Sequence, residues 1–414
     1  MQEAKMPDKK ISLYVVIKVA EVCNIACTYC YFFFGGDESY KEKPGFMPHA
    51  TMVKTANFLR KGVEDLGITD LTVCFHGGEP LMVGKRRFGA YCRALREALD
   101  DIVRLRIDVQ TNAMLVDDAW IQLFSEHDVG IGVSIDGPAA MHDRVRIDKN
   151  YVGTHSRTVE GLAKLQQAVA NGQIRAPAAI CVLGEDSDAA TLFDYFFDEL
   201  KVRAVSFRAP IMDWGTLSPE VEARTRVFYR ELLDLWLSRG DPGLTIELFR
   251  RLFGGLLADH NWFPATHELP LIVVRSDGAL CPHDALGPLD LQYQNSGCSI
   301  FTHSLQSFFD HNLWGTMAWG FHLPEQECSS CKWAGACGGG DVENRFDPVA
   351  GFKRKSVYCE TYRDVCDRLH LYAARSMSTV EIDRRLSRRR ATLLSLRQKE
   401  VDRSAVIPVL GELT

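Results

Sequence analysis

Three cysteines stand close together near the start of the chain. Cys23, Cys27 and Cys30 lie in the segment EVCNIACTYCYF, with three and then two residues between them. Thiolates at this spacing on one loop can hold three irons of a cubane iron–sulfur cluster, which leaves the fourth iron open to a substrate or cofactor. A zinc knot with a distant fourth ligand is the alternative for the same three cysteines.

Two later segments carry groups suited to ligand binding. The segment FHGGEP starts at Phe75; its two glycines let the backbone approach a ligand, and the Glu79 carboxylate can accept bonds from an amino group. Taken alone, such a Gly-Gly-Glu segment is most often a turn. The segment SIDGP starts at Ser134, and Arg146 follows twelve residues after that serine. Both segments follow predicted strands, so we expect their polar groups at one end of a sheet.

A second group of cysteines lies near the other end of the chain. Cys328, Cys331 and Cys337 are separated by two and then five residues, and Cys359 lies 22 residues beyond Cys337. Such a set can hold either zinc or an iron–sulfur cluster. The chain has 13 cysteines in all, and in a reducing compartment they are poor candidates for disulfides. Metal or redox chemistry is therefore the first function to test.

The elements that must position these residues alternate between two types. Over the first half of the chain, short β-rich runs alternate with helical patterns such as 52–66 and 158–170, which is typical of βα units on a parallel sheet. Because candidate residues follow several strands, the pattern predicts a partial (β/α)6 barrel of the TIM type with its chemistry at the C-terminal ends of the strands. The predicted strands are 13–19, 71–76, 106–110, 130–135, 178–183 and 204–208.

The remainder is expected to form helices and a small second domain. Residues 219–257 have apolar residues at helical spacing, and the sequence from Ser276 to Gly278 is a hairpin signal. An arginine-rich helix at 377–403 is interpreted as a solvated amphipathic helix or as a surface for an acidic peptide or partner. The expected divisions are 1–210 for the barrel, 211–269 for a connecting helical segment, 270–370 for the second domain and 371–414 for a C-terminal helical tail.

The composition is that of an ordinary globular protein. Hydrophobic residues make up 46% of the chain and charged residues 25%, and the formal net charge is −6. This slightly acidic balance gives no electrostatic footprint for nucleic acid. The apolar stretch 11–17 is too short for a membrane span and lacks a signal-peptide cleavage site, so we expect a cytoplasmic protein with no membrane partner.

The motifs together resemble those of the radical SAM superfamily. Cys23, Cys27 and Cys30 match its 4Fe–4S cluster motif, with Tyr29 in the usual place before the last cysteine. The resemblance implies that the cluster passes one electron to bound S-adenosylmethionine and that cleavage yields a 5′-deoxyadenosyl radical. It also implies contacts with S-adenosylmethionine: Gly78 and Glu79 at the methionyl amino group, Ser134 at the ribose, Arg146 at the carboxylate, and Gln110, Thr111, Asn112 and Ile180 either as contacts or as structural residues.

The later cysteines resemble those of a SPASM domain, the C-terminal domain of radical SAM peptide maturases. By that match, an auxiliary 4Fe–4S cluster is held by Cys328, Cys331, Cys337 and Cys359. The second auxiliary cluster of the family is not expected, because two of its cysteine positions hold other residues. A degenerate version of it would use Cys281, Cys298, His283 or Asp341. The other cysteines are expected to be buried small hydrophobic residues: Cys74, Cys92, Cys181 and Cys366.

Asp284 keeps the position that bears the catalytic base in sulfatase-maturing relatives. Oxidation of a C–H bond to a C–C or C–O bond releases two electrons and two protons, and hydrogen abstraction accounts for one of each. Asp284 could take the remaining proton and the auxiliary cluster the remaining electron. The alternative is that Asp284 is a turn residue near the metal domain; Asp213 and His283 are lesser candidates for the base.

Within the SPASM group, the chain resembles the cyclophane-forming peptide maturases. The features concerned are CGGG from Cys337, RF from Arg345, GF from Gly351 and SVYC from Ser356. The resemblance implies a ribosomally made precursor peptide as substrate, an aromatic-to-Cβ crosslink as product, and an electron donor such as flavodoxin or ferredoxin. The alternatives are a thioether or ether crosslink, epimerisation, sulfatase maturation and, in a different class, a non-catalytic zinc or electron-transfer protein.

Overall fold

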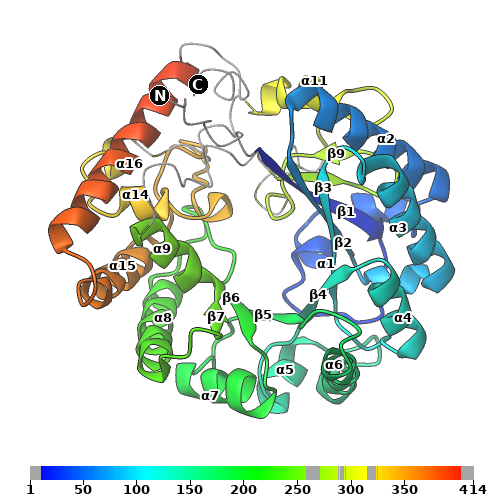
Figure 1. The fold of residues 1–414 in the computed structure, drawn as a ribbon, viewed down its shortest axis with the longest axis horizontal. Helices are drawn as coiled ribbons and strands as arrows, with labels where there is room; N and C mark the ends of the chain where they lie inside the picture. Colours follow the sequence, from blue (N-terminus) through cyan, green and yellow to red (C-terminus); the bar gives the residue numbers. More distant parts are fainter. Residues whose placement is uncertain are drawn as a thin grey trace, which may run out of the picture.

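The computed structural model describes residues 11–257, 271–287, 289, 293, 295–314, 323 and 325–401. These residues form one curved sheet with the strand order β7-β6-β5-β4-β3-β2-β1-β8-β9. Figure 1 shows the strands on the inside of an open ring and most of the helices along its outside. The strands are β1 (Ser12–Ala20), β2 (Asp70–Gly77), β3 (Arg104–Thr111), β4 (Val129–Ser134), β5 (Ala178–Val182), β6 (Ala204–Arg208), β7 (Thr245–Ile246), β8 (Ile272–Val274) and β9 (Leu280–Cys281).

The six predicted strands are confirmed as β1 to β6, all parallel. Parallel strands are buried on both faces, which is why β1 reads as an almost continuous apolar run interrupted by the charge of Lys18. Their C-terminal ends lie at the same edge of the sheet. The fold is therefore a mixed α/β partial barrel, as the sequence predicts, and that edge gathers the candidate residues.

Helix α8 (Pro219–Arg239) begins and ends at residues with clear capping roles. At the start of α8, Pro219 follows Ser218, whose hydroxyl accepts a bond from the Val221 amide, and the helix ends at Gly240 in the left-handed region. The longer helices are α2 (His49–Leu66), α3 (Lys85–Leu99), α4 (Asp118–Glu126), α6 (His155–Ala170), α8 (Pro219–Arg239), α9 (Glu247–Leu257), α15 (Cys359–Ala373) and α16 (Thr379–Val401). The shorter ones are α1 (Tyr31–Phe34), α5 (Ala139–Val145), α7 (Ala189–Asp194), α11 (Leu305–Phe309), α13 (Glu325–Cys328) and α14 (Ala334–Cys337).

The connecting segment differs from the all-helical prediction for 219–257. After α8, the sequence Gly240-Asp241-Pro242-Gly243 cannot continue a helix, and the Asp241 carboxylate accepts a bond from the Gly243 amide at 2.8 Å. The chain then forms β7, which extends the sheet by pairing with β6, before α9 begins. A two-residue strand between two helical patterns carries too little periodicity to be seen in the sequence.

The predicted hairpin is confirmed, but it belongs to the barrel sheet. β8 and β9 pair antiparallel through a turn with Gly278 at a φ of 88°, and β8 also pairs in parallel with β1. The hairpin thus lies beside the start of the chain although the sequence separates them by about 250 residues. The proposed domain limits remain predictions. Of the residues they include, 1–10, 258–270, 288, 290–292, 294, 315–322, 324 and 402–414 lie outside the described residues.

The C-terminal helices pack on the far side of the ring, against α8 and α9 (Figure 1). Two glycines let α14 approach its neighbours: a Cβ on Gly255 would lie 2.8 Å from the Ala336 carbonyl oxygen, and one on Gly335 would lie 2.6 Å from that of Leu386. α16 is amphipathic as predicted, yet its Arg389 is buried rather than solvated. Among the described residues, no helix is long and apolar enough to cross a membrane.

Candidate active site

The first cysteine group occupies the loop that follows β1 and precedes α1. Backbone bonds fix this loop: the Ala26 amide donates to the Ile147 carbonyl at 2.7 Å, and the Thr28 amide donates to the Val145 carbonyl at 2.9 Å. Cys27 is buried, whereas Cys23 and Cys30 are half-buried. The loop therefore holds its three thiols in place through residues far along the chain.

Burial opposes ionisation of these thiols when no cation is bound. Burial, with a smaller effect of the neighbouring thiols of the loop, raises the pKa of Cys23 to about 12 and that of Cys27 to about 11. Iron supplies the positive charge that stabilises thiolates at such a site, so the donor set fits an iron–sulfur cluster held by Cys23, Cys27 and Cys30. No group of three or more His, Cys, Asp or Glu side chains in the described residues is arranged to hold a single metal ion.

The two glycines at the end of β2, Gly77 and Gly78, are required by packing against the chain that leads into this loop. A Cβ on Gly77 would lie 2.0 Å from the Ala20 carbonyl oxygen, and one on Gly78 would lie 2.1 Å from the Val22 carbonyl oxygen. The Glu79 amide donates to the same Val22 oxygen at 2.9 Å. The GGE sequence thus brings the end of β2 against the chain that leads into the cysteine loop. The predicted contact of Gly78 with a ligand remains a prediction.

Glu79 is buried and tied to the end of β3. Its carboxylate accepts bonds from the Leu81 amide at 3.0 Å, the Thr111 hydroxyl at 2.7 Å and the Asn112 amide at 2.8 Å. Burial nevertheless raises its pKa to about 7. The Asn112 side chain in turn donates to the Asn24 side chain at 2.8 Å, so the predicted residues Glu79 and Asn112 are linked to the cysteine loop.

Asp136 joins the cysteine loop to the predicted residue Arg146 and to the end of β5, although the sequence analysis assigns it no role. Its carboxylate accepts bonds from the Arg146 guanidinium at 2.8 and 3.3 Å, from the Tyr29 hydroxyl at 2.5 Å and from the Val182 amide at 2.9 Å. Arg146 also approaches the Cys27 sulfur at 3.8 Å. The protein partner of Arg146 is therefore Asp136. The predicted pairing of Arg146 with a ligand carboxylate remains a prediction.

Ser134, Gln110 and Ile180 meet at the ends of neighbouring strands. The Gln110 amide donates to the Ser134 hydroxyl at 2.8 Å, and Ile180 is the β5 partner of Ser134 in the strand register. The structure thus brings all the residues predicted to contact S-adenosylmethionine to the edge that carries the cysteine loop. Asp136 could have been recognised by its place inside the quoted SIDGP segment.

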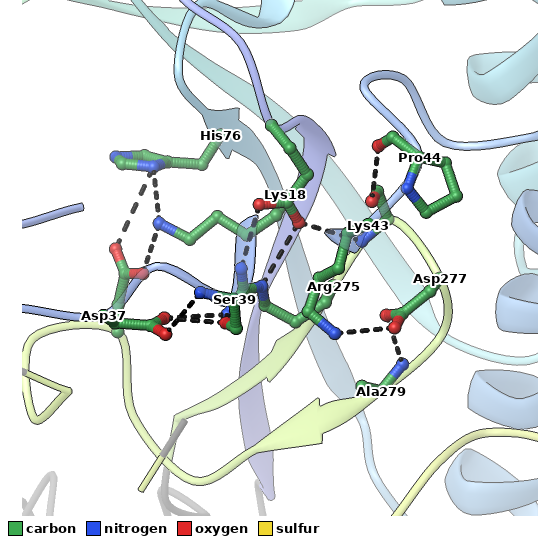
Figure 2. Close-up of polar contacts among 12 residues, drawn as sticks. Lys18, Asp37, Ser39, Lys43, Pro44, His76, Arg275, Asp277 and Ala279 are labelled. Carbon is green, nitrogen blue, oxygen red and sulfur yellow. Dashed lines mark hydrogen bonds and ion pairs between the residues drawn. The ribbon is translucent and has the colours of Figure 1, made fainter. Parts of the chain in front are cut away.

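Asp284 lies at this edge too, after the β8–β9 hairpin. It pairs with Lys18 of β1 and accepts a bond from the Tyr31 hydroxyl at 2.5 Å; Tyr31 directly follows Cys30. The Lys18 ammonium also contacts His76 Nδ1 at 3.2 Å (Figure 2). Burial raises the pKa of Asp284, but the Lys18 ammonium and the hydrogen bond from Tyr31 outweigh it and hold that pKa well below its usual range. The carboxylate is therefore ionised near neutral pH.

A buried ionic network fixes the hairpin that precedes Asp284. The Arg275 guanidinium donates to Glu21 at 3.0 and 3.2 Å, to Asp37 at 3.4 Å and to the Ser39 hydroxyl at 3.2 Å. Figure 2 shows this network beside Lys18 and His76, between the hairpin and the segment after α1. The sequence did not single out these residues; the charge of Arg275 at the end of an apolar strand is the signal that was present.

The second cysteine group converges where three short elements meet. Cys328 ends α13, Cys337 ends α14 and Cys359 begins α15. Burial, with a smaller effect of the other thiols of the group, Cys331 among them, raises the pKa of Cys328 to about 12 and that of Cys337 to about 11. The four predicted cysteines are thus brought together, and as a set of buried thiols they fit an iron–sulfur cluster.

Arg345 is a buried cation beside this second group. Its guanidinium donates to the carbonyls of Phe352 at 3.0 Å and Arg354 at 2.9 Å, and it interacts electrostatically with Cys328 and Cys337. Burial lowers its pKa to about 10, which leaves it charged near neutral pH. The sequence analysis names Arg345 only as part of a motif and predicts no contact between it and the cysteines.

The residues considered for a degenerate second auxiliary cluster are separately engaged. Asp341 pairs with Arg251 and accepts a bond from the Tyr362 hydroxyl at 2.9 Å. Cys281 packs with Val16 and Val273, and Cys298 lies in the main core. The four cysteines expected to be small hydrophobic residues are all buried: Cys74, Cys92, Cys181 and Cys366.

Comparison with known proteins shows which proteins this chain is similar to. Residues 17–185 match the family model of the radical SAM superfamily. The chain is 27% identical over 384 residues to a serine-type anaerobic sulfatase-maturating enzyme of Bacteroides thetaiotaomicron, covering 84% of this chain and 87% of that one. It is 23% identical over 372 residues to a cysteine-type anaerobic sulfatase-maturating enzyme of Clostridium novyi, covering 85% and 94%.

A solved structure supports the same fold. The chain superposes on native anSMEcpe with bound AdoMet and Cp18Cys peptide with a TM-score of 0.71 at 21% identity, covering 88% of this chain and 100% of that one. Radical SAM enzymes use a 4Fe–4S cluster and S-adenosylmethionine, and the cysteine loop lies within the matched residues. Residues 17–185 therefore form a radical SAM domain, in an enzyme homologous to the anaerobic sulfatase-maturating enzymes.

Proposed function

We propose that this enzyme is a peptide maturase that oxidises a side-chain carbon of a peptide. The observation that carries the proposal is the position of Asp284: an ionised carboxylate contacts Tyr31, the residue next to Cys30, at the mouth of the barrel. Side-chain oxidation releases a proton after hydrogen abstraction, and a carboxylate at this place can accept it. Homology to two kinds of sulfatase-maturating enzyme supports a protein or peptide substrate.

The cofactors divide between the two cysteine groups. Cys23, Cys27 and Cys30 would hold the radical SAM cluster, and the second group, Cys328 with its three partners, would hold an auxiliary 4Fe–4S cluster. When bound, these groups and S-adenosylmethionine supply a carbon-centred radical and an acceptor for an electron. The S-adenosylmethionine contacts are those expected from the motifs: Tyr29, Gly78, Glu79, Gln110, Asn112, Ser134, Arg146 and Ile180.

The residues of the chain then have separate tasks. Lys18 keeps Asp284 ionised and fixes the direction of its carboxylate, while the Tyr31 hydroxyl holds one of its oxygens. The Arg275 network keeps the hairpin, and with it Asp284, at a fixed place relative to the cysteine loop. Placement on a rigid element limits the substrate carbons that can lose a proton to Asp284.

Two products are the candidates. The relatives favour oxidation of a serine or cysteine side chain in a sulfatase. The motifs around the second cysteine group favour an aromatic-to-Cβ crosslink in a ribosomal precursor peptide, and the non-cysteine residues His283 and Asp341 separate the chain from the sulfatase-maturing pattern. In both cases a flavodoxin or ferredoxin is the proposed electron donor.

The test is an anaerobic assay of the reconstituted enzyme with S-adenosylmethionine and a reductant. It uses two peptides, a sulfatase peptide with its target serine and a candidate precursor peptide chosen from small open reading frames next to the gene. Tandem mass spectrometry then locates any change in each peptide. Loss of two hydrogens confined to the serine supports the sulfatase-type reaction. Loss of two hydrogens shared between an aromatic residue and the residue two positions later, with no fragmentation between them, supports the crosslink.

Two variants complete this experiment. Cys27→Ala should abolish formation of 5′-deoxyadenosine, and Asp284→Asn should stop peptide modification while 5′-deoxyadenosine is still formed. Both peptides unchanged beside abundant 5′-deoxyadenosine would reject both proposed substrates. Full peptide modification by Asp284→Asn would remove Asp284 from the reaction.

A further inference from the structure

His76 is the penultimate residue of β2 and lies beside Asp284, and the proposed reaction gives it no role. Figure 2 shows its ring with both marked contacts on one nitrogen and the second nitrogen directed away from Lys18. The first nitrogen, Nδ1, lies 3.2 Å from Lys18 Nζ and 3.9 Å from an Asp284 oxygen. The ring is thus held on one side by charged groups.

The chemistry of the Lys18 ammonium fixes the tautomer of this ring. An ammonium group has three donors and no acceptor, and Lys18 carries the charge that pairs with Asp284. Its contact with Nδ1 therefore requires that Nδ1 be the acceptor, which leaves the proton of the neutral imidazole on Nε2. Burial and the Lys18 charge lower the pKa of His76 to about 4, in agreement with a neutral ring.

The Nε2–H group has no hydrogen-bond partner in the part of the chain that the structure describes. It is also not among the polar atoms sealed from solvent, and the side chain is 26% exposed. A donor of fixed direction that is open to solvent at the mouth of a barrel is suited to an acceptor on a ligand.

We propose that His76, held as the Nε2–H tautomer by Lys18, donates a hydrogen bond to a carbonyl or hydroxyl oxygen of the peptide substrate beside Asp284. The inference rests on the proposed function, because it takes a peptide as the ligand. Lys18 then serves two groups at once: it keeps Asp284 as an acceptor and His76 as a donor. A substrate oxygen bound at His76 would place the adjoining carbon close to the carboxylate that receives its proton.

The tautomer is measured by two-bond nitrogen–proton correlation spectra of the reconstituted enzyme labelled with ¹⁵N-histidine. The signal of His76 among the 12 histidines is the one that disappears in His76→Gln and persists in His49→Gln, a variant of the exposed histidine that begins α2. A protonated Nε2 and an unprotonated Nδ1 near neutral pH are expected. A protonated Nδ1, alone or with Nε2, would overturn the proposal without touching the proposed function, because no peptide is present.

The contact with substrate is measured by the peptide KM and kcat of two variants. His76→Gln keeps an amide donor at the reach of Nε2, and His76→Phe removes the donor while both lose the Nδ1 acceptor. His76→Phe should have a peptide KM roughly 2- to 10-fold above that of His76→Gln, the range of one hydrogen bond, with equal iron content. Equal KM values for the two variants would overturn the contact. If the wild-type enzyme modifies neither peptide, the proposed function and this contact with it fail, whereas the tautomer result still stands.

Discussion

Replacing Asp136 by asparagine tests whether this residue holds the cofactor edge together. Asp136 is buried and accepts bonds from Arg146, Tyr29 and Val182, which belong to three different segments. The asparagine side chain would have nearly the same shape but no charge, so the buried Arg146 guanidinium would lose its counter-ion. The substitution therefore isolates the electrostatic part of the contact.

The magnitude follows from burial of the pair. Removing one partner of a buried ion pair costs about 3–5 kcal/mol, because the other charge is left unpaired in a medium that solvates it poorly. At about 2.1 cal/mol/K of unfolding entropy per residue, this loss lowers the melting temperature of a chain of 414 residues by roughly 3–6 °C. Tyr29 and the Cys27 loop should loosen with it, so a lower iron content is also expected.

The assay is urea and thermal unfolding of the reconstituted enzyme without S-adenosylmethionine, so that ligand binding does not contribute. Asp101→Asn is the matched control, since Asp101 makes a similar two-bond contact with Arg60 at 2.8 and 3.1 Å but lies exposed at the surface. Solvent screens that pair, and its loss should matter far less. A loss of stability in Asp136→Asn no larger than that in Asp101→Asn would refute the reasoning.

Three further predictions concern other parts of the two cysteine sites. Because burial raises the pKa of Glu79 to about 7, the folded protein holds a proton that the unfolded chain releases above about pH 4.5. The free energy of unfolding in urea should therefore fall by about 3 kcal/mol for the wild type relative to Glu79→Gln as the pH rises from 4.5 to 7. Parallel plots of unfolding free energy against pH for the two proteins would contradict this. Gly78→Ala should lower the iron content of the first site through a clash with the Val22 carbonyl, whereas Gly184→Ala, whose Cβ would meet nothing within 4 Å, should not. Arg345→Met should make the reduction potential of the auxiliary cluster more negative, because the nearby cation stabilises the reduced form, and Arg345→Lys should shift the potential less. The measurement is a redox titration followed by electron paramagnetic resonance. An unchanged potential in Arg345→Met would show that the cation does not act on the cluster.

The parallel core of the fold is readable from the sequence because buried strands leave strong local signals. β1 to β6 are apolar runs bounded by turns, and their predicted limits agree with the structure within about two residues. β7 and the pairing of β8 with β1 are not readable in the same way. The first is too short, and the second is a contact between segments far apart in the chain, which no local pattern encodes.

The residues of the candidate site likewise fall into those that local motifs reveal and those that only the tertiary fold reveals. Residue types that bind iron or S-adenosylmethionine occur in compact motifs, so Cys27, Glu79 and Arg146 could be named from the sequence. The partners that set their state come from other segments: Asp136 holds Arg146, and Lys18 holds both Asp284 and His76. These pairings depend on the tertiary fold. The local hints of them are the charge of Lys18 inside an apolar strand and the place of Asp136 inside the SIDGP segment.

The transfer of a hydrogen atom from peptide to cofactor tests the central claim most directly. The measurement uses the sulfatase serine peptide and the neighbouring precursor peptide, each deuterated at the Cβ positions, and determines by mass spectrometry whether 5′-deoxyadenosine carries deuterium. We predict that one deuterium appears in 5′-deoxyadenosine for one of the two peptides and that Cys27→Ala forms none of this nucleoside. Nucleoside without deuterium beside both peptides would contradict hydrogen abstraction from a side-chain carbon of these substrates.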